Sequence, residues 1–177
     1  MSEAAEPQLD YLEYYEDFLA RVRLLSRKIG ESGWMPDFII GIGRGGLVPG
    51  CYISHQLELP MLSIDHSAKV PGFADDLLAS VAKMSAEGRK MLFVDDINDS
   101  GGTIDYIRTR LAEGGCNDAN VRFAVIINNR SSKVEVDLWA DMIDRAEDKR
   151  WFVFPWESVG TKESIVEEAL SVPERLG

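Results

Sequence analysis

Short runs of mostly apolar residues are the feature that most constrains the fold of this chain. Each run is followed directly by glycine or by acidic or amide side chains. Strands covered by helices on both faces have this pattern, whereas strands with one face in water alternate apolar and polar residues. The runs are residues 38–42, 61–64, 91–94 and 121–127. They predict an α/β fold with a central, mainly parallel sheet flanked by helices.

The segments between these runs have helical or extended patterns. Residues 9–29 place apolar side chains at three- and four-residue intervals, as one face of an amphipathic helix requires. Thr161 begins a polar C-terminal helix or tail. Further helices are expected over residues 47–57, 75–85 and 103–113, and further extended segments over residues 134–138 and 151–156.

Size and charge limit the domain count and the partners. A chain of 177 residues with 45% hydrophobic residues is expected to form a single domain over residues 1–177. The formal net charge of -11 opposes binding to nucleic acid or to an anionic membrane, so neither is expected as a partner. No apolar run approaches membrane-spanning length, and no signal peptide is recognisable, which predicts a cytoplasmic location.

The third apolar run leads into a loop rich in carboxylates, hydroxyls and glycine. Asp95, Asp96 and Asp99 precede a Ser-Gly-Gly-Thr turn, residues 100–103, that enters a predicted helix. A turn at a helix N-terminus offers aligned N–H groups and hydroxyls to a phosphate. The carboxylates would repel that phosphate unless they faced hydroxyl groups or Mg²⁺. An acidic loop with an ordinary helix cap is the simpler alternative.

A glycine-rich turn follows the first apolar run. Residues 43–46 read Gly-Arg-Gly-Gly, in which Arg44 supplies a forked cation and the glycines let the backbone approach an anion. Such turns are common, so an ordinary turn with one exposed arginine is an equal alternative.

Together, three segments resemble the type I phosphoribosyltransferase family, and most of all its xanthine-guanine and hypoxanthine members. Residues 91–103 resemble the family's phosphoribosyl pyrophosphate (PRPP) signature, residues 44–50 its pyrophosphate loop, and residues 151–157 its base-binding hood. The resemblance implies a core over about residues 36–130. It also implies a small C-terminal hood over about residues 131–160, with a contribution from residues 1–33.

The resemblance implies roles for individual residues in a Mg²⁺-dependent transfer to a nucleobase. PRPP would be held by Arg44, Gly45, Asp95, Asp96, Asp99, Ser100, Gly101, Gly102 and Thr103. The catalytic residues would be Asp99, which manages the base proton, and Arg44, which faces pyrophosphate. Asp96 and Asp95 would hold Mg²⁺. The base would contact Trp151, Phe152, Asn128 and Ile97.

The acceptor is less clearly implied than the donor. The 6-oxopurine members place a lysine after the fourth strand, where this chain has Asn128, Asn129 and Arg130. An asparagine amide or Arg130 could donate the same hydrogen bond. The preferred acceptor is therefore a 6-oxopurine, namely xanthine, guanine or hypoxanthine. The alternatives are a pyrimidine or other acceptor, and a noncatalytic PRPP-binding regulator.

Three further expectations concern the surroundings of the site. The alternating aromatics of residues 151–156 serve the core as well as the base. The charged residues 141–150 are interpreted as solvated surface, and the loop after His66 as a lid. The family resemblance also implies a homo-oligomer, either a dimer or a tetramer.

Overall fold

The central sheet of the chain is five-stranded and entirely parallel. The computed structural model describes residues 7–11, 15–65 and 73–171. The strand order is β3-β2-β4-β5-β6, and each neighbouring pair runs in the same direction. The strands are β2 (Phe38–Ile42), β3 (Met61–Ile64), β4 (Met91–Asn98), β5 (Val121–Asn129) and β6 (Leu138–Ile143). The predicted parallel sheet is therefore confirmed.

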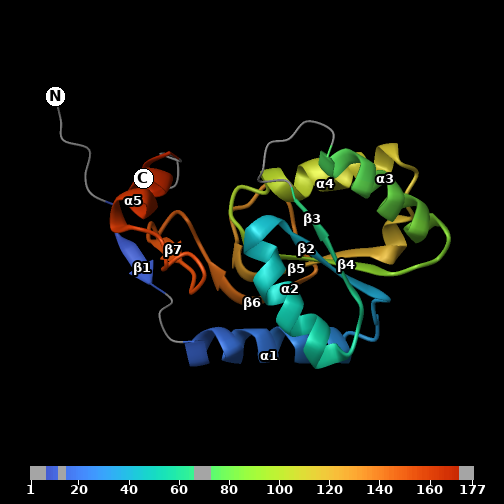
Figure 1. Ribbon diagram of the computed structural model, residues 1–177, viewed down its shortest axis with the longest axis horizontal. Helices are drawn as coiled ribbons and strands as arrows, with labels where there is room; N and C mark the ends of the chain where they lie inside the picture. The colour runs from blue at the N-terminus through green and yellow to red at the C-terminus, as the bar shows by residue number, and fades with distance from the viewer. Residues whose placement is uncertain (1–6, 12–14, 66–72, 172–177) are drawn as a thin grey trace.

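Helices cover both faces of this sheet (Figure 1). On β4, Leu92 and Val94 pack in one core cluster, while Met91 and Phe93 pack in the other. All four side chains are fully buried, which explains why the run is continuously apolar. One face is covered by α1 (Tyr15–Glu31) and α2 (Gly43–Leu57), the other by α3 (Phe73–Ala86) and α4 (Gly102–Glu113).

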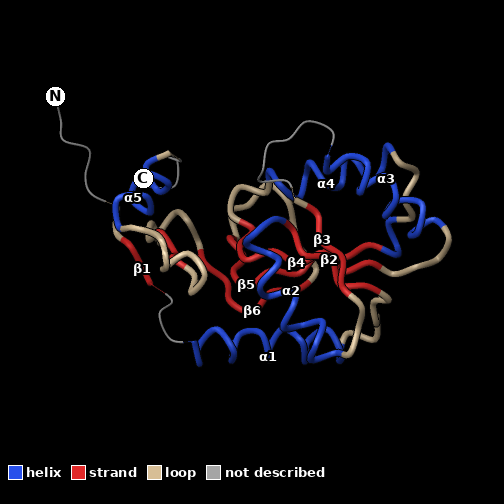
Figure 2. Tube along the Cα trace, viewed as in Figure 1, coloured by secondary structure: helices blue, strands red, loops and turns tan. Residues whose placement is uncertain are grey.

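A second, two-stranded sheet lies beside the central one (Figure 2). In it β1 (Leu9–Tyr11) pairs in parallel with β7 (Trp151–Val153), and α5 (Lys162–Leu170) lies next to them. Thr161 caps α5 by accepting the N–H of Ser164 at 3.2 Å. We call β1, β7 and α5 the hood. The segment expected to form the hood, residues 131–160, also contains β6, which belongs to the central sheet.

The prediction of one helix over residues 9–29 is wrong at its start. Residues 9–11 form β1, and α1 begins at Tyr15. The ladder with β7 satisfies the backbone of residues 9–11, so a partner distant in sequence overrides the local helical pattern. From Phe18 onward the predicted apolar face is present, with Phe18, Val22 and Leu25 buried against the sheet.

Two other boundaries differ from the sequence prediction. Helix α2 begins at Gly43 rather than at residue 47, so the glycine-rich segment is the first turn of a helix. The extended segment expected over residues 134–138 begins as a strand only at Leu138. The loop proposed as a lid lies mostly in residues 66–72, outside the described residues. Among the described helices, none combines the length and apolarity needed to cross a membrane.

Candidate active site

The order of the strands creates a crevice at one edge of the sheet. From β2 the chain crosses to β3 on one side, whereas β4 lies on the other side of β2. The segments that leave β2 and β4 therefore diverge, and ligands of open parallel sheets bind in the crevice at such a point. The two predicted anion-binding segments, residues 43–46 and 95–103, are the ones that border it.

The first turn of α2 packs directly against β4. A Cβ atom on Gly46 would overlap the Val94 carbonyl oxygen, and one on Gly45 would overlap the Asp96 carboxylate. Only glycine allows this approach at position 46, where the overlap is with backbone, whereas a Cβ at position 45 would have to displace the Asp96 carboxylate. Arg44 is exposed in the same turn. The α2 N-terminus and its exposed arginine thus lie beside the strand-end carboxylate of Asp96.

Asp95 and Asp96 form an adjacent pair of carboxylates at the end of β4. The Asp95 carboxylate accepts the N–H of Asp96 at 3.0 Å, and the Asp96 carboxylate accepts the N–H of Ile97 at 2.7 Å. Burial raises the pKa of Asp95 well above its usual range, and the negative charge of Asp96 raises it further. Hydroxyl donors or a cation would relieve this repulsion, so the pair suits a sugar or a divalent ion.

Residues 100–103 form a small cradle at the N-terminus of α4. Gly101 has a positive φ of 87°, and a Cβ there would lie 2.9 Å from the Ser132 hydroxyl, so glycine is required. Residues 97–104 line a hollow of about 40 Å³. The exposed Ser100 and the N–H groups of the first turn border it, which suits a phosphate group.

The carboxylate of Asp99 is buried and paired with an arginine. Arg145 donates from Nε to both carboxylate oxygens at 3.1 Å and from Nη2 to Oδ2 at 2.9 Å. Asp99 is 5% exposed, and the Arg145 side chain is 11% exposed. Asn129 Nδ2 donates to the Asp99 carbonyl oxygen at 3.0 Å. The segment containing Arg145 had been interpreted as solvated surface, and for Arg145 that interpretation is wrong.

Of the predicted base-binding residues, Phe152 contacts this ion pair. Arg145 and Arg150 stand over the Phe152 ring, at 5.2 and 5.4 Å from its centroid. Phe152 is buried, while Trp151 and Ile97 are partly exposed. Asn128 is buried and accepts Asn98 Nδ2 at 2.9 Å, so its carbonyl oxygen is already engaged. Stacking by Trp151 therefore remains a prediction, as does recognition by Asn128.

Glu157 was not predicted as a site residue, but it faces the same crevice. Its carboxylate accepts the N–H of Phe154 at 2.9 Å. Burial raises the pKa of Glu157 to about 7, with a further increase from Asp96 and an opposing effect of Arg44. The segment after β7 therefore lies within electrostatic range of Asp96 and of the turn that follows β2. Its place at the end of the hood-like segment, residues 151–157, was the sequence signal for Glu157.

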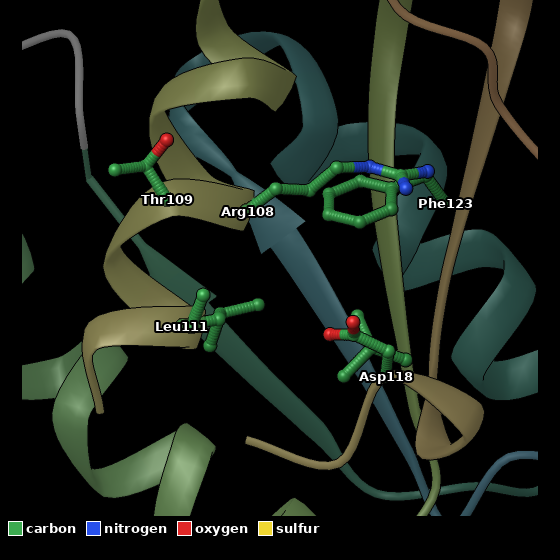
Figure 3. A pocket seen from close by; sticks show the side chains of 7 residues that line it. Arg108, Thr109, Leu111, Asp118 and Phe123 are labelled. Carbon is green, nitrogen blue, oxygen red and sulfur yellow. The ribbon is translucent and has the colours of Figure 1, made fainter. Parts of the chain in front are cut away.

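A larger hollow, of about 330 Å³, lies elsewhere on the molecule (Figure 3). Arg108, Leu111 and Phe123 line it, together with Asp118, which precedes β5. Phe123 lies near the amino end of β5, whereas the candidate site borders the carboxyl end. None of the predicted site residues lines this hollow.

Paired carboxylates and an amide-rich turn at such a crevice define a protein that binds a hydroxylated, anionic ligand such as a sugar phosphate. The family model for the phosphoribosyl transferase domain matches residues 10–159. The chain therefore belongs to the phosphoribosyltransferase family, which confirms the predicted family and enzyme class.

Individual relatives agree with this assignment. A xanthine-guanine phosphoribosyltransferase of Idiomarina loihiensis is 30% identical over 126 residues, covering 67% of this chain and 70% of the relative. One of Nitratidesulfovibrio vulgaris is 28% identical over 145 residues, covering 81% and 82%. The solved purine phosphoribosyltransferase of Pyrococcus horikoshii is 24% identical, with a TM-score of 0.62, over 83% of this chain and 92% of that one. The last similarity confirms the fold.

Proposed function

We propose that the protein transfers the 5-phosphoribosyl group of PRPP to a 6-oxopurine base, giving a nucleoside monophosphate and pyrophosphate. One observation supports the proposal: the first turn of α2 packs against the Asp96 carboxylate, at the end of the strand whose following loop carries Asp99 and residues 100–103. The names of the relatives, xanthine-guanine phosphoribosyltransferases, support the choice of base.

Each part of the donor has a counterpart in this crevice. Residues 100–103 hold the 5-phosphate, because the α4 N-terminus offers N–H groups and hydroxyls. Asp95 and Asp96 accept hydrogen bonds from the ribose hydroxyls. Arg44 and the N–H groups of Gly45 and its neighbours face the pyrophosphate. They stabilise the negative charge that develops on this group as its bond to C1 breaks.

Asp95 and Asp96 also fit Mg²⁺. The ion is commonly bound through one or two carboxylates together with substrate phosphates, so a full set of protein ligands is not required. Among the described residues no group of three or more acidic, histidine or cysteine side chains is clustered for a metal. When bound with PRPP, Mg²⁺ would supply positive charge next to the leaving pyrophosphate.

Asp99 manages the proton of the base in this proposal. The incoming base must lose a ring proton as its nitrogen bonds to C1, and a carboxylate fixed beside the ring can accept it. The bidentate contact with Arg145 fixes the carboxylate in one orientation. Trp151 and Ile97 border the space that the ring would occupy.

The test is base-dependent release of pyrophosphate. The protein is incubated with Mg²⁺, PRPP and single bases: xanthine, guanine, hypoxanthine, adenine, uracil and orotate. We expect turnover with at least one 6-oxopurine and little with adenine. Turnover only with a pyrimidine would show that the acceptor is a pyrimidine and not a 6-oxopurine. Binding of PRPP without turnover of any base would favour the regulator instead. A homodimer or homotetramer and a cytoplasmic location stay predictions.

A further inference from the structure

The guanidinium of Arg145 is held by hydrogen bonds to several groups. Its Nη1 donates to the carbonyl oxygens of Asp148 at 3.2 Å and Arg150 at 2.6 Å, and its Nε and Nη2 donate to Asp99. A guanidinium has five N–H donors. Contacts among the described residues account for four of them and leave one N–H on Nη2, next to the Asp99 carboxylate.

The backbone of Arg145 is fixed as well. Its N–H donates to Asn129 Oδ1 at 3.1 Å, and Asn129 in turn donates to Asp99. The guanidinium carbon of Arg145 lies over the ring of Phe152, 5.2 Å from its centroid. An arginine that lies over an aromatic ring and makes a bidentate contact with a carboxylate has little rotational freedom. The side chain is therefore preorganised, and the loop after β6 fixes the direction of the remaining N–H group on Nη2.

The Arg145–Asp99 pair presents a donor beside an acceptor. Nη2 of Arg145 and Oδ2 of Asp99 are 2.9 Å apart. The Asp99 carboxylate accepts Nε and Nη2 of Arg145 and, at 3.4 Å, Nδ2 of Asn129. The contact with Asn129 is long, so a proton of the base can take its place while the pairing with Arg145 persists. A 6-oxopurine presents the complementary edge, an acceptor oxygen at position 6 beside ring nitrogen 7, which carries a proton in one tautomer of the free base.

Other donors near this edge are less suitable. Asn128 is buried against Asn98, and the amide nitrogen of Asn129 is directed at Asp99. Arg130 is exposed on the loop after β5. Among the described residues considered for recognition of the base, Arg145 alone combines burial, a fixed orientation and contact with Asp99.

We propose that Arg145 is a specificity-determining residue: it donates a hydrogen bond to the oxygen at position 6 of the base while Asp99 accepts the proton of the neighbouring ring nitrogen. The inference rests on the proposed function and extends it from the class of base to the residue that selects it. A 6-aminopurine is disfavoured because its amino group and the guanidinium would both be donors.

The test compares hypoxanthine with unsubstituted purine, which lacks only the oxygen at position 6. In the wild type, the ratio of kcat/KM for hypoxanthine to that for purine is expected to be about 10 to 100, the value of one charge-assisted hydrogen bond. In Arg145→Met the ratio is expected to fall close to 1. A purely structural arginine would lower both rates alike and leave the ratio unchanged, which would overturn the inference.

Two more variants keep the test decisive. Arg145→Lys retains the buried positive charge beside Asp99 and is expected to give a ratio between those of the wild type and Arg145→Met. If Arg145→Met folds poorly, a ratio in Arg145→Lys equal to that of the wild type would overturn the inference. Arg150→Met is the matched control: Arg150 also stands over Phe152, but it is half-exposed and pairs with Asp148 and Asp10. Its ratio should equal that of the wild type.

Binding of PRPP with Mg²⁺, measured by calorimetry, should change little in all three variants. A ratio that falls in Arg150→Met as much as in Arg145→Met would also overturn the inference. A wild type that turns over no base would remove the proposed function and this inference with it. A wild type that uses hypoxanthine with an unchanged ratio in Arg145→Met removes the inference alone.

Discussion

At the scale of single residues, a substitution of Asp99 can test the proposed proton transfer separately from the binding of PRPP. Asp99→Asn keeps the size of the side chain and an acceptor for Arg145, but an amide cannot take a proton. We expect kcat with a 6-oxopurine to fall about 100-fold or more, the usual contribution of a positioned general base. The Kd for PRPP, measured by calorimetry with Mg²⁺, should change far less.

The control for Asp99→Asn is Asp105→Asn. Asp105 is exposed in the first turn of α4, so the change removes the same charge from the same region. Its kcat is expected to stay close to that of the wild type. Equal losses of kcat and of PRPP affinity in Asp99→Asn would contradict the proton role and point to a structural one.

Glu157 gives a prediction about pH and stability. Its pKa in the folded protein, about 7, is raised above the ordinary value of 4.5. The folded state therefore binds this proton more tightly than the unfolded state does. The stability that protonation contributes is lost as the pH rises from about 4.5 to about 7. Glu157→Gln keeps the acceptor for Phe154 and should be more stable than the wild type at pH 8 by about 1–3 kcal/mol.

The measurement is the free energy of unfolding in denaturant at pH 5 and at pH 8. The advantage of Glu157→Gln should be much smaller at pH 5, because Glu157 in the folded wild type is then largely neutral, as glutamine is. Glu167→Gln, which removes an exposed hood carboxylate, is the control. An advantage that is the same at both pH values would show that the charge of Glu157 is not what destabilises the folded state.

These residues also mark how far the sequence could predict the site. Gly45, Asp96 and Gly101 belong to local patterns in which neighbours in sequence fix the chemistry, and the structure places them at one crevice. Arg145 meets Asp99 across 46 residues of chain, and no local pattern carries that contact. Its position after β6, at the carboxyl edge of a parallel sheet, was the one available signal.

At the scale of elements, the contact between α2 and β4 depends on Gly46. Because an added Cβ would overlap the Val94 carbonyl oxygen, Gly46→Ala must push the first turn of α2 away from β4. We expect a loss of about 1–3 kcal/mol or more in the free energy of unfolding, as for overpacked cores. The binding of PRPP should weaken as well, since Arg44 lies in the displaced turn.

Gly30→Ala is the matched control for this change. Gly30 is exposed near the end of α1, and nothing lies within 4 Å of the position of an added Cβ. Alanine is the better helix former there, so a gain of about 0.5–1 kcal/mol is expected. Denaturant unfolding of both variants measures the effects. A neutral Gly46→Ala would mean that α2 does not need its close approach to β4.

Elements were predictable wherever their own side chains determine them. The β4 run is buried on both faces and therefore reads as a strand without knowledge of its partners. Strand β1 lacks such a run. Its three residues are extended because β7 offers a hydrogen-bonding edge, which is information held by residues 151–153 and not by residues 9–11.

At the scale of the whole molecule, aromatic contacts join the core to the segment between β7 and α5, which connects two elements of the hood. Phe18 on α1 lies edge-on to Trp156 with ring centroids 5.4 Å apart, and edge-on to Tyr52 of α2 at the same separation. Phe18 is 3% exposed. Phe18→Ala removes this joint and should cost about 3–5 kcal/mol of stability. It should also loosen the hood selectively.

Hydrogen exchange measures that loosening. In Phe18→Ala, the backbone N–H groups of β7 are expected to exchange faster relative to those of β4 than in the wild type, because the hood can open without global unfolding. Leu111→Ala, in the core cluster on the opposite face of the sheet, is the control for lost stability alone. Equal acceleration of β7 in both variants would contradict a specific joint at Phe18.

The pairing of β1 with β7 has a consequence for how the molecule is made. Asp10, in the middle of β1, forms an ion pair with Arg150, which directly precedes β7 and lies 140 residues later in the chain. On the ribosome, β1 cannot pair until β7, about 140 residues later in the sequence, has been made. The sheet that carries the sugar-phosphate loop can close earlier from local βαβ units. If the proposed function holds, the donor half of the pocket can therefore exist in a nascent chain that does not yet have a place for the acceptor.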